Sequence, residues 1–179
     1  MFYLLRHGET NFNAEGLIQG HSDKSVLNDK GKMQIENAGR LLAEKVEYFD
    51  EVYCSDILRA KESWEILKEH IRYIRVSFDS VLREQFQGCF EGLPYTDSNW
   101  LLNKSCVAES ELDVESRMAD FFKNLDSEKE ILIISHGHAL KLFLSSIGVG
   151  IEKIPNGAII KMNWNLNENE SPVFEILTS

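Results

Sequence analysis

The chain has 179 residues with a formal net charge of −10 at pH 7; 43% of the residues are hydrophobic and 27% are charged. This length favours one domain over residues 1–179, and the composition excludes collagen-like, low-complexity and disordered classes. The acidic balance argues against a nucleic-acid or membrane-surface partner, although a few Arg and His residues can still form a local pocket for a small anion.

The first half of the chain predicts alternating strands and helices. An apolar run over residues 2–5 fits a buried strand, and the polar, aperiodic stretch 11–27 predicts a loop. Asn28 is a suitable N-cap for a helix over residues 29–47. The elements expected next are a strand over 51–55, a helix that Asp56 caps and whose apolar face reaches Leu67, a short strand over 76–78 and a structured loop over 84–103.

The second half continues this alternation. The expected elements are a helix over 109–125, a buried strand over 131–134, a helix over 139–146, a turn at Asn156-Gly157, and strands over 158–164 and 172–177, the last at an edge. The pattern predicts an α/β three-layer sandwich, in which a mainly parallel central sheet has helices on both faces and an antiparallel edge strand.

The cysteines and the N-terminus bear on the compartment. Cys54, Cys89 and Cys106 are odd in number and lack CxxC spacing, which argues against a disulfide scaffold or a zinc knuckle and favours a reducing compartment. The apolar run at the N-terminus is too short for a signal peptide, and no run of 18 apolar residues predicts a membrane span. We therefore expect a cytoplasmic protein.

Two predicted strands end in a His-Gly pair, at residues 7–8 and 136–137. Ligands in open α/β sheets bind at the C-terminal ends of the strands, so both imidazoles are expected at one edge of the sheet. The glycines allow a sharp turn and the close approach of an oxyanion. Together with the charged residues near other strand ends, the candidate site residues are His7, His136, Arg6, Arg59 and Glu84.

This candidate set suits phosphoryl transfer. The planar fork of Arg fits phosphate oxygens, and two such residues spread the transition-state charge. A neutral imidazole is a good nucleophile toward phosphorus, and a second, protonated imidazole can donate to the phosphoryl oxygens. A carboxyl group in a partly buried pocket can protonate a leaving alkoxide. Together these groups indicate a reaction through a phosphohistidine.

Five motifs, in order and at matching spacing over nearly the whole chain, resemble those of the histidine phosphatase superfamily, the phosphoglycerate-mutase-like fold. They are Arg6-His7-Gly8-Glu9-Thr10-Asn11-Phe12-Asn13, Gln19-Gly20, the SxxxRA element of Ser55, Arg59 and Ala60, the ExxxGxxEG element of Glu84, Gly88, Glu91 and Gly92, and Ser135-His136-Gly137. Gly31 and Gln34 also match the start of the family's first helix.

The resemblance implies a role for each matching residue. His7 would be the nucleophile that becomes phosphorylated, and Glu84 would be the proton donor and later the base for water. The phosphoryl group would be bound by Arg6, Arg59 and His136, with Asn13 as a further amide donor and Gln19 and Gly20 at the border of the pocket. Neither a metal nor a cofactor is implied.

Some residues depart from this pattern or allow other interpretations. The run after Asp23 is one residue longer than usual and lacks proline, and Phe90 replaces a frequent tryptophan. His138 forms an HxH pair with His136, which suggests a metal site, but no third ligand cluster supports it. The aromatic residues of the 84–103 loop either line a substrate pocket or pack a lid onto the core; they are Phe86, Phe90, Tyr95 and Trp100.

The spacing favours a phosphatase over a mutase. Glu84 and His136 are 52 positions apart (136 − 84), which is short for a glycolytic mutase of the family, and Thr10 and Phe12 stand where such mutases usually have Ser and Trp. We expect a phosphomonoesterase of the histidine acid phosphatase type that hydrolyses a small phosphorylated metabolite through a phosphohistidine on His7. The alternatives are a phosphoglycerate-type mutase and, in another class, a catalytically idle module that binds phospho-ligands or proteins.

Overall fold

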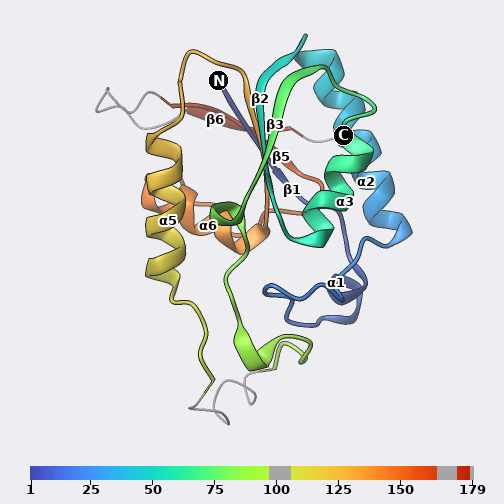
Figure 1. Ribbon diagram of the computed structural model, residues 1–179, viewed down its shortest axis with the longest axis vertical. Coiled ribbons are helices and arrows are strands. Elements are labelled where there is room, and N and C mark those ends of the chain that lie inside the picture. Colours follow the sequence, from blue (N-terminus) through green and yellow to red (C-terminus); the bar gives the residue numbers. More distant parts are fainter. Residues whose placement is uncertain (97–105, 165–172, 178–179) are drawn as a thin grey trace.

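A six-stranded sheet forms the centre of the computed structural model, which describes residues 1–96, 106–164 and 173–177 (Figure 1). Its strands are β1 (Phe2–Arg6), β2 (Phe49–Ser55), β3 (Tyr73–Asp79), β4 (Ile131–Ser135), β5 (Ile159–Asn163) and β6 (Val173–Leu177). The order across the sheet is β3-β2-β4-β1-β5-β6. Strands β1 to β4 pair in parallel, whereas β5 pairs antiparallel with both β1 and β6. The mainly parallel sheet and the antiparallel edge strand are thus confirmed.

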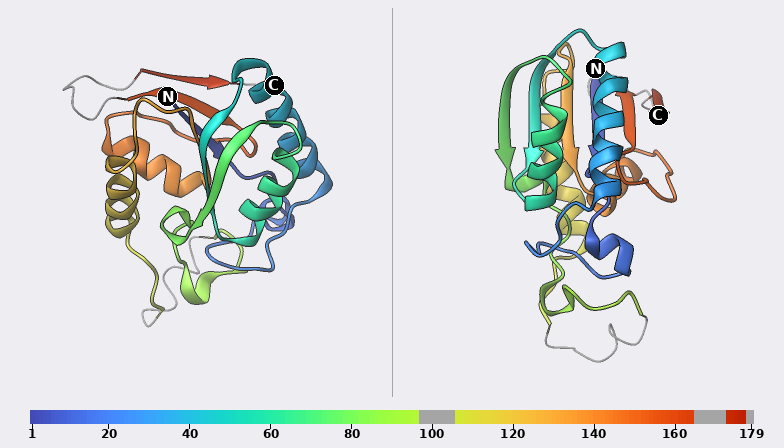
Figure 2. Two further views of the ribbon diagram at one scale, coloured as in Figure 1. Left: turned by 45° about the horizontal axis from the view of Figure 1, so that its top comes forward. Right: turned by 90° about the vertical axis from the view of Figure 1, so that its right-hand side faces the viewer.

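Helices cover both faces of this sheet (Figures 1 and 2). One face packs against α2 (Asp29–Lys45) and α3 (Leu58–Leu67), and the other against α5 (Glu111–Lys123) and α6 (Gly137–Ser146). Successive side chains of a strand point to opposite faces. In β1, Tyr3 and Leu5 therefore join the core under α2 and α3, while Phe2 and Leu4 join the core under α5 and α6. The three-layer α/β sandwich is confirmed.

The prediction of a loop over residues 11–27 was partly wrong, because α1 (Asn11–Glu15) lies within it. Thr10 and Asn13 form a capping box, and Gly16 ends the helix with a φ of 68°, a left-handed conformation that glycine adopts without strain. A helix of one turn shows no apolar periodicity, so the hydrophobic pattern could not reveal it.

The predicted cap of α3 was also wrong. Its N-cap is Ile57, whose side chain forms no capping hydrogen bond. Asp56 instead accepts two hydrogen bonds of 2.6 Å from Nε and Nη2 of Arg83. By contrast, Asn28 caps α2 as predicted, because its Oδ1 accepts from the Gly31 N–H at 2.8 Å.

A disulfide joins Cys89 to Cys106, whose Cα atoms are 5.7 Å apart. This corrects the expectation drawn from cysteine spacing, and it removes two of the three cysteines from the argument for a reducing compartment. Only Cys54 is free, and it is buried in β2. No helix in the part of the chain that the structure describes is long and apolar enough to cross a membrane.

The loops that follow the parallel strands gather at one end of the molecule. Figure 2 shows that α1 and the loop carrying the short 3-10 helix η2 (Gly88–Phe90) extend beyond this end of the sheet. Another 3-10 helix, η1 (Ser80–Leu82), follows β3 directly. These connections place residues from distant parts of the sequence around the ends of β1, β2 and β4.

Candidate active site

The sheet register brings His7 and His136 together. Arg6, the last residue of β1, pairs with Ser135, the last residue of the neighbouring parallel strand β4. The next residue of each chain segment is a histidine, so the two imidazoles leave the same edge of the sheet. Their ring centroids are 5.2 Å apart, and both side chains are buried. The prediction that two strand ends deliver two histidines to one edge is thus confirmed.

The contacts of His7 fix its tautomer. Its Nδ1 lies 2.7 Å from the carbonyl oxygen of Gly8. Because a carbonyl oxygen can only accept, Nδ1 carries the hydrogen and Nε2 holds a lone pair. Arg59 Nε donates to Nε2 at 3.2 Å. Burial and the charges of Arg59 and Arg6 hold the pKa of His7 well below its usual 6.5, so the ring is neutral at pH 7.

Two arginines flank the histidines. Arg59 is completely buried on α3, where its Nη2 donates to the carbonyl oxygen of Gly20 at 2.9 Å. Burial lowers the pKa of Arg59 to about 10, so it is still charged at pH 7. Arg6 Nη1 donates to the carbonyl oxygen of Ile154 at 2.6 Å. Its guanidinium lies against Gly137, where an added Cβ would come within 2.9 Å of Arg6 Nε.

Three buried nitrogens of this cluster have no hydrogen-bond partner among the described residues: Arg6 Nε, Arg59 Nη1 and His136 Nδ1. Buried polar groups are nearly always paired in folded proteins, and an unpaired group costs about 1–3 kcal/mol. The two arginine nitrogens are permanent donors. Such a group of unsatisfied donors can be satisfied by a ligand that brings several acceptor oxygens and negative charge.

His136 differs in charge from the sequence expectation. Burial, followed by the charges of Arg59, His7 and Arg6, holds the pKa of His136 well below 6.5. The ring is therefore neutral at pH 7 in the ligand-free protein, whereas the sequence analysis had assumed a protonated second histidine. The composition could not predict this, because the causes are the burial of His136 and the nearby charges of the two arginines, which depend on the fold.

Glu84 lies at the N-terminus of α6. Its Oε1 accepts from the backbone N–H groups of Gln85 at 3.0 Å and Ala139 at 2.9 Å, and its Oε2 accepts from the N–H of His138 at 3.2 Å. Ser135 holds the preceding segment by donating from Oγ to the Leu82 carbonyl at 2.8 Å. The carboxylate is thus fixed relative to the end of β4, on the same side as the two histidines.

Asn13 and Gln19 turn their amide nitrogens toward the site. The Asn13 Oδ1 accepts from the Thr10 N–H at 3.2 Å and from Asn156 Nδ2 at 3.1 Å. The Gln19 Oε1 accepts from Ser25 Oγ at 2.6 Å and from Thr10 Oγ1 at 3.1 Å. Because both oxygens are occupied, the NH2 groups are the parts of these amides left to bind a ligand.

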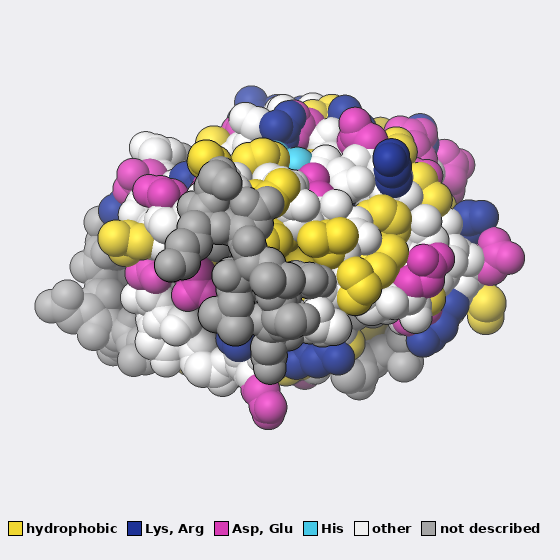
Figure 3. All heavy atoms as spheres, turned by 90° about the horizontal axis from the view of Figure 1, so that it is seen from below, with side chains coloured by type: hydrophobic (Ala, Val, Ile, Leu, Met, Phe, Trp, Pro, Cys, Tyr) yellow, Lys and Arg dark blue, Asp and Glu magenta, His cyan; other side chains and the backbone are white. Residues whose placement is uncertain are grey.

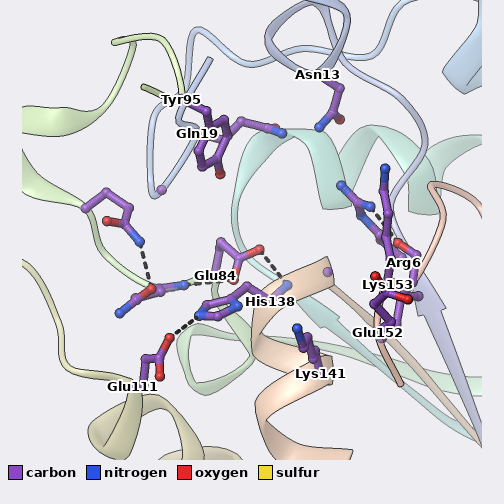
Figure 4. Close-up of a pocket in the computed structure, with 15 residues that line it drawn as sticks. Arg6, Asn13, Gln19, Glu84, Tyr95, Glu111, His138, Lys141, Glu152 and Lys153 are labelled. Carbon is purple, nitrogen blue, oxygen red and sulfur yellow. Dashed lines mark hydrogen bonds and ion pairs between the residues drawn. The ribbon is translucent and has the colours of Figure 1, made fainter. Parts of the chain in front are cut away.

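A cavity of about 460 Å³ opens in front of these residues (Figure 4). Its lining includes Arg6, Asn13, Gln19, Gly20 and Glu84 from the predicted site. The other lining residues are Gln85, Gln87, Tyr95, Glu111, Gly137, His138, Lys141, Glu152, Lys153 and Ile154. Figure 3, a view onto this end of the molecule, shows acidic, basic and hydrophobic side chains interspersed, with a small patch of histidine surface.

The remaining predicted residues do not line the cavity but lie one step behind its wall. His7 follows Arg6 in the chain, His136 precedes Gly137, and Arg59 is hydrogen-bonded to Gly20. The structure therefore assembles all five candidate residues, with Arg6 and Glu84 accessible from the cavity and the other three enclosed behind it.

Sequence reasoning missed Asn156 and Ser55. Asn156 was predicted only as a turn residue, but its Nδ2 donates to the carbonyl oxygen of His7 at 3.2 Å as well as to Asn13. Ser55 was noted only as a motif residue, but its Oγ lies 2.7 Å from His136 Nε2. Both partners are distant in sequence, so no local pattern could have indicated either contact.

The aromatic residues of the 84–103 loop divide between the two interpretations. Tyr95 lines the cavity, whereas Phe90 is buried. The ring of Phe86 packs against that of His21, with centroids 5.2 Å apart. Trp100 lies outside the described residues. The pocket and the packing interpretations are therefore each correct for some of these side chains.

His138 is engaged by an acid. Its Nε2 lies 3.2 Å from Glu111 Oε1, and both residues line the cavity. Within the three described ranges, no group of three or more His, Cys, Asp or Glu side chains could hold a metal ion. The HxH pair of His136 and His138 therefore gains no third ligand from these parts of the chain.

Comparisons with known proteins agree with this geometry. A family model described as "Histidine phosphatase superfamily (branch 1)" matches residues 2–171. The broad-specificity phosphatase YOR283W of Saccharomyces cerevisiae is 28% identical, over 79% of this chain and 67% of its own length. The fructose-2,6-bisphosphatase TIGAR of Xenopus tropicalis is 31% identical, over 68% of this chain and 48% of its own. The chain thus spans between about half and two thirds of these relatives.

Solved structures share the fold. The mycobacterial glucosyl-3-phosphoglycerate phosphatase Rv2419c superimposes with a TM-score of 0.77 over 99% of this chain and 97% of its own, at 20% identity. A phosphoserine phosphatase from Entamoeba histolytica also gives a TM-score of 0.77, over 99% of this chain and 96% of its own, at 21% identity. At such identities the likeness establishes the arrangement of the elements and nothing finer.

Proposed function

The chain belongs to the histidine phosphatase superfamily, and from this premise we propose that it is a phosphomonoesterase that hydrolyses a small phosphorylated metabolite through a phosphohistidine on His7. One observation carries the proposal. A neutral imidazole with its Nε2 lone pair fixed by Gly8 stands among three buried nitrogens that lack partners in the described chain, on Arg6, Arg59 and His136. A phosphoryl group supplies both the acceptor oxygens and the electrophile that this arrangement suits.

In the first step, the phosphoryl oxygens accept hydrogen bonds from Arg6, Arg59 and His136. The Arg59 Nε–H, which donates to His7 Nε2 in the free site, transfers its hydrogen bond to a phosphoryl oxygen and frees the lone pair. The bond from Nε2 to phosphorus forms while the bond from phosphorus to the ester oxygen breaks. Glu84 gives its proton to the leaving alkoxide, because an alkoxide is a poor leaving group without one.

In the second step, Glu84 acts as a base. Its carboxylate takes a proton from a water molecule whose oxygen attacks phosphorus, and the bond between phosphorus and Nε2 breaks. Inorganic phosphate leaves, and His7 returns to its neutral form. The Gly8 carbonyl stabilises the positive charge on the phosphorylated ring, because it accepts from Nδ1–H throughout.

The cavity lining supports a hydrophilic leaving group. Its volume of about 460 Å³ lies within the range of about 300–1,000 Å³ that is usual for small-molecule sites. Most lining side chains are charged or carry amides, and Tyr95 and Ile154 are the only large side chains with much apolar surface among the lining residues. We infer that the alcohol released is a polar metabolite, in line with the sugar and glycerate phosphates named for several relatives.

A phosphate-trapping experiment tests the proposal. Wild-type protein quenched during turnover of labelled substrate should carry an acid-labile, alkali-stable phosphate on the peptide that contains His7. His7→Ala should lose both the adduct and the release of inorganic phosphate from p-nitrophenyl phosphate and from a panel of sugar phosphates. His70→Ala is the matched control, because His70 does not line the cavity.

The outcomes separate the alternatives. Full activity in His7→Ala would overturn the mechanism. Transfer of phosphate to a second position of the substrate, without release, would identify a mutase. Tight binding of phosphorylated ligands without turnover would identify the idle binding module.

A further inference from the structure

Ser55 and His136 form a buried pair behind the cavity. Ser55 ends β2, the strand beside β4, and both side chains have no exposed surface. The Ser55 Oγ lies 2.7 Å from His136 Nε2. The opposite ring nitrogen, Nδ1, has no partner among the described residues. Whatever sets the proton on Nε2 therefore also decides whether Nδ1 is a donor or an acceptor.

The bond between Ser55 and His136 permits two arrangements. In one, the serine hydroxyl donates to Nε2, and Nδ1 carries the ring hydrogen. In the other, Nε2–H donates to the serine oxygen, and Nδ1 has a bare lone pair. A hydroxyl can both donate and accept, so its distance from Nε2 does not distinguish them.

The surroundings of the hydroxyl distinguish the two arrangements. The backbone N–H of Ile57 also donates to Ser55 Oγ, at 3.4 Å. Within the described ranges, His136 Nε2 is the only hydrogen-bond acceptor that the serine hydrogen contacts. If Nε2–H also donated to Oγ, the serine hydrogen would be buried without an acceptor, which would destabilise that arrangement. If the hydroxyl donates to Nε2, its hydrogen, its lone pair and the histidine nitrogen are all satisfied.

We propose that Ser55 is a positioning residue whose hydroxyl holds neutral His136 in the Nδ1–H tautomer, so that Nδ1–H donates to the phosphoryl group. The assignment of the tautomer stands on the hydrogen bonds alone, and its use toward a phosphoryl group rests on the proposed function. His136 then needs no positive charge to donate. This fits an imidazole that burial and two neighbouring arginines keep neutral.

The opposite tautomer would oppose the reaction. A bare Nδ1 would turn a lone pair toward the phosphoryl oxygens, and the site would lose one of its donors. A mispaired hydrogen bond to a charged group corresponds to roughly a 10- to 100-fold change in rate. Ser55 thus contributes through His136, although it neither touches the substrate nor lines the cavity.

Nitrogen NMR on protein labelled with 15N-histidine tests this directly. Long-range proton–nitrogen correlations distinguish a protonated from an unprotonated ring nitrogen, and the His136 signals are identified by their loss in His136→Asn. In the ligand-free wild type at pH 7, we expect Nδ1 to be protonated and Nε2 to be bare. This measurement needs no Ser55 variant, so a folding defect cannot obscure it.

Variants then test whether Ser55 is the cause. Ser55→Ala should move His136 toward the Nε2–H tautomer and lower kcat about 10- to 100-fold. Ser55→Thr, which keeps the hydroxyl, should restore the wild-type tautomer and much of the rate. A wild-type Nε2–H signal, or a Ser55→Ala protein with unchanged tautomer and unchanged kcat, would overturn the proposal. A chain with the expected signals and no phosphatase activity would instead refute the proposed function while leaving the tautomer assignment intact.

Discussion

Replacing Glu84 with glutamine should slow the hydrolysis of alkyl phosphates far more than that of p-nitrophenyl phosphate. The substitution removes the proton that the leaving oxygen requires but keeps nearly the same shape. An alkoxide from a sugar or glycerate is a strong base and leaves poorly without that proton. A nitrophenolate is stable as an anion and needs the proton much less.

The structure sets the size of two effects. Glu84 Oε1 accepts two backbone N–H groups and Oε2 accepts a third, from His138 at 3.2 Å. The Oε1 of glutamine can keep the two hydrogen bonds from Gln85 and Ala139. Its NH2 group would then face the His138 N–H, so that two donors would oppose each other without an acceptor. We expect the free energy of unfolding to fall by about 1–3 kcal/mol. The loss of a general acid should lower kcat on alkyl phosphates by about 10²–10⁴-fold.

The assay compares both substrates under conditions in which phosphorylation of His7 limits the rate. Stopped-flow bursts with p-nitrophenyl phosphate identify the limiting step. This matters because the proposed mechanism also uses Glu84 in the second step, after the leaving group has gone. Glu91→Gln is the matched control. Its carboxylate accepts from the backbone N–H groups of His21 and Gln87 and does not line the cavity, so the ratio of the two rates should not change.

An equal loss on both substrates, with phosphorylation limiting, would refute the role of Glu84 as the acid and leave it as a binding residue. A selective loss in Glu91→Gln instead would assign the proton to that carboxylate.

Three further outcomes are expected. Dialysis against EDTA should leave the rate nearly unchanged, because two arginines supply the cationic clamp that a metal gives other phosphoryl-transfer enzymes; a strict need for added divalent ions would contradict this. Gly31→Ala should lower the free energy of unfolding in urea by more than about 1–3 kcal/mol, because the added Cβ would lie 2.0 Å from the Glu9 carbonyl oxygen. The control is Gly150→Ala, whose Cβ would meet no atom within 4 Å and should leave this free energy nearly unchanged. The free energy of unfolding should also fall as the pH drops below about 6.5, by up to roughly 1.4 kcal/mol per pH unit for each of His7 and His136. Below this pH the unfolded chain binds protons at both histidines, whereas the buried rings of the folded chain stay neutral because their pKa values are lowered. A free energy of unfolding that does not change with pH over this range would show that the rings are not held neutral.

The sheet and the two histidines could be predicted because their signals are local. Four consecutive buried residues mark β4, and each histidine follows directly on its strand. Parallel strands end at the same edge, so naming the strands was sufficient to place His7 and His136 at the same edge of the sheet. Asn28 was predictable for the same reason, since a cap acts on the helical turn that follows it.

The rest depends on contacts between distant segments. Asp56 has the right position for a cap, but Arg83, 27 residues away, pairs with it instead. Ser55 contacts His136, which is 81 residues away, and Cys89 pairs with Cys106, which is 17 residues away and follows no spacing rule. A sequence pattern indicates the local conformational preference of one segment. These contacts form only when the fold brings two distant segments together, so a local pattern does not predict them.

The site also explains how a chain of charge −10 can bind an anion. Net charge acts through solvent, where salt screens it beyond about 8–10 Å. Arg59 is instead completely buried and Arg6 is half-buried, and neither forms an ion pair with a carboxylate in the described part of the chain. Backbone carbonyls of Ile154 and Gly20 hold them in place without neutralising them. Two cations that are withdrawn from water and lack an ion-pair partner are costly, and a doubly charged phosphoryl group would relieve that cost where a neutral ligand of the same shape would not. We therefore expect any selectivity for phosphate to depend on the missing ion-pair partners of the two arginines rather than on the overall charge.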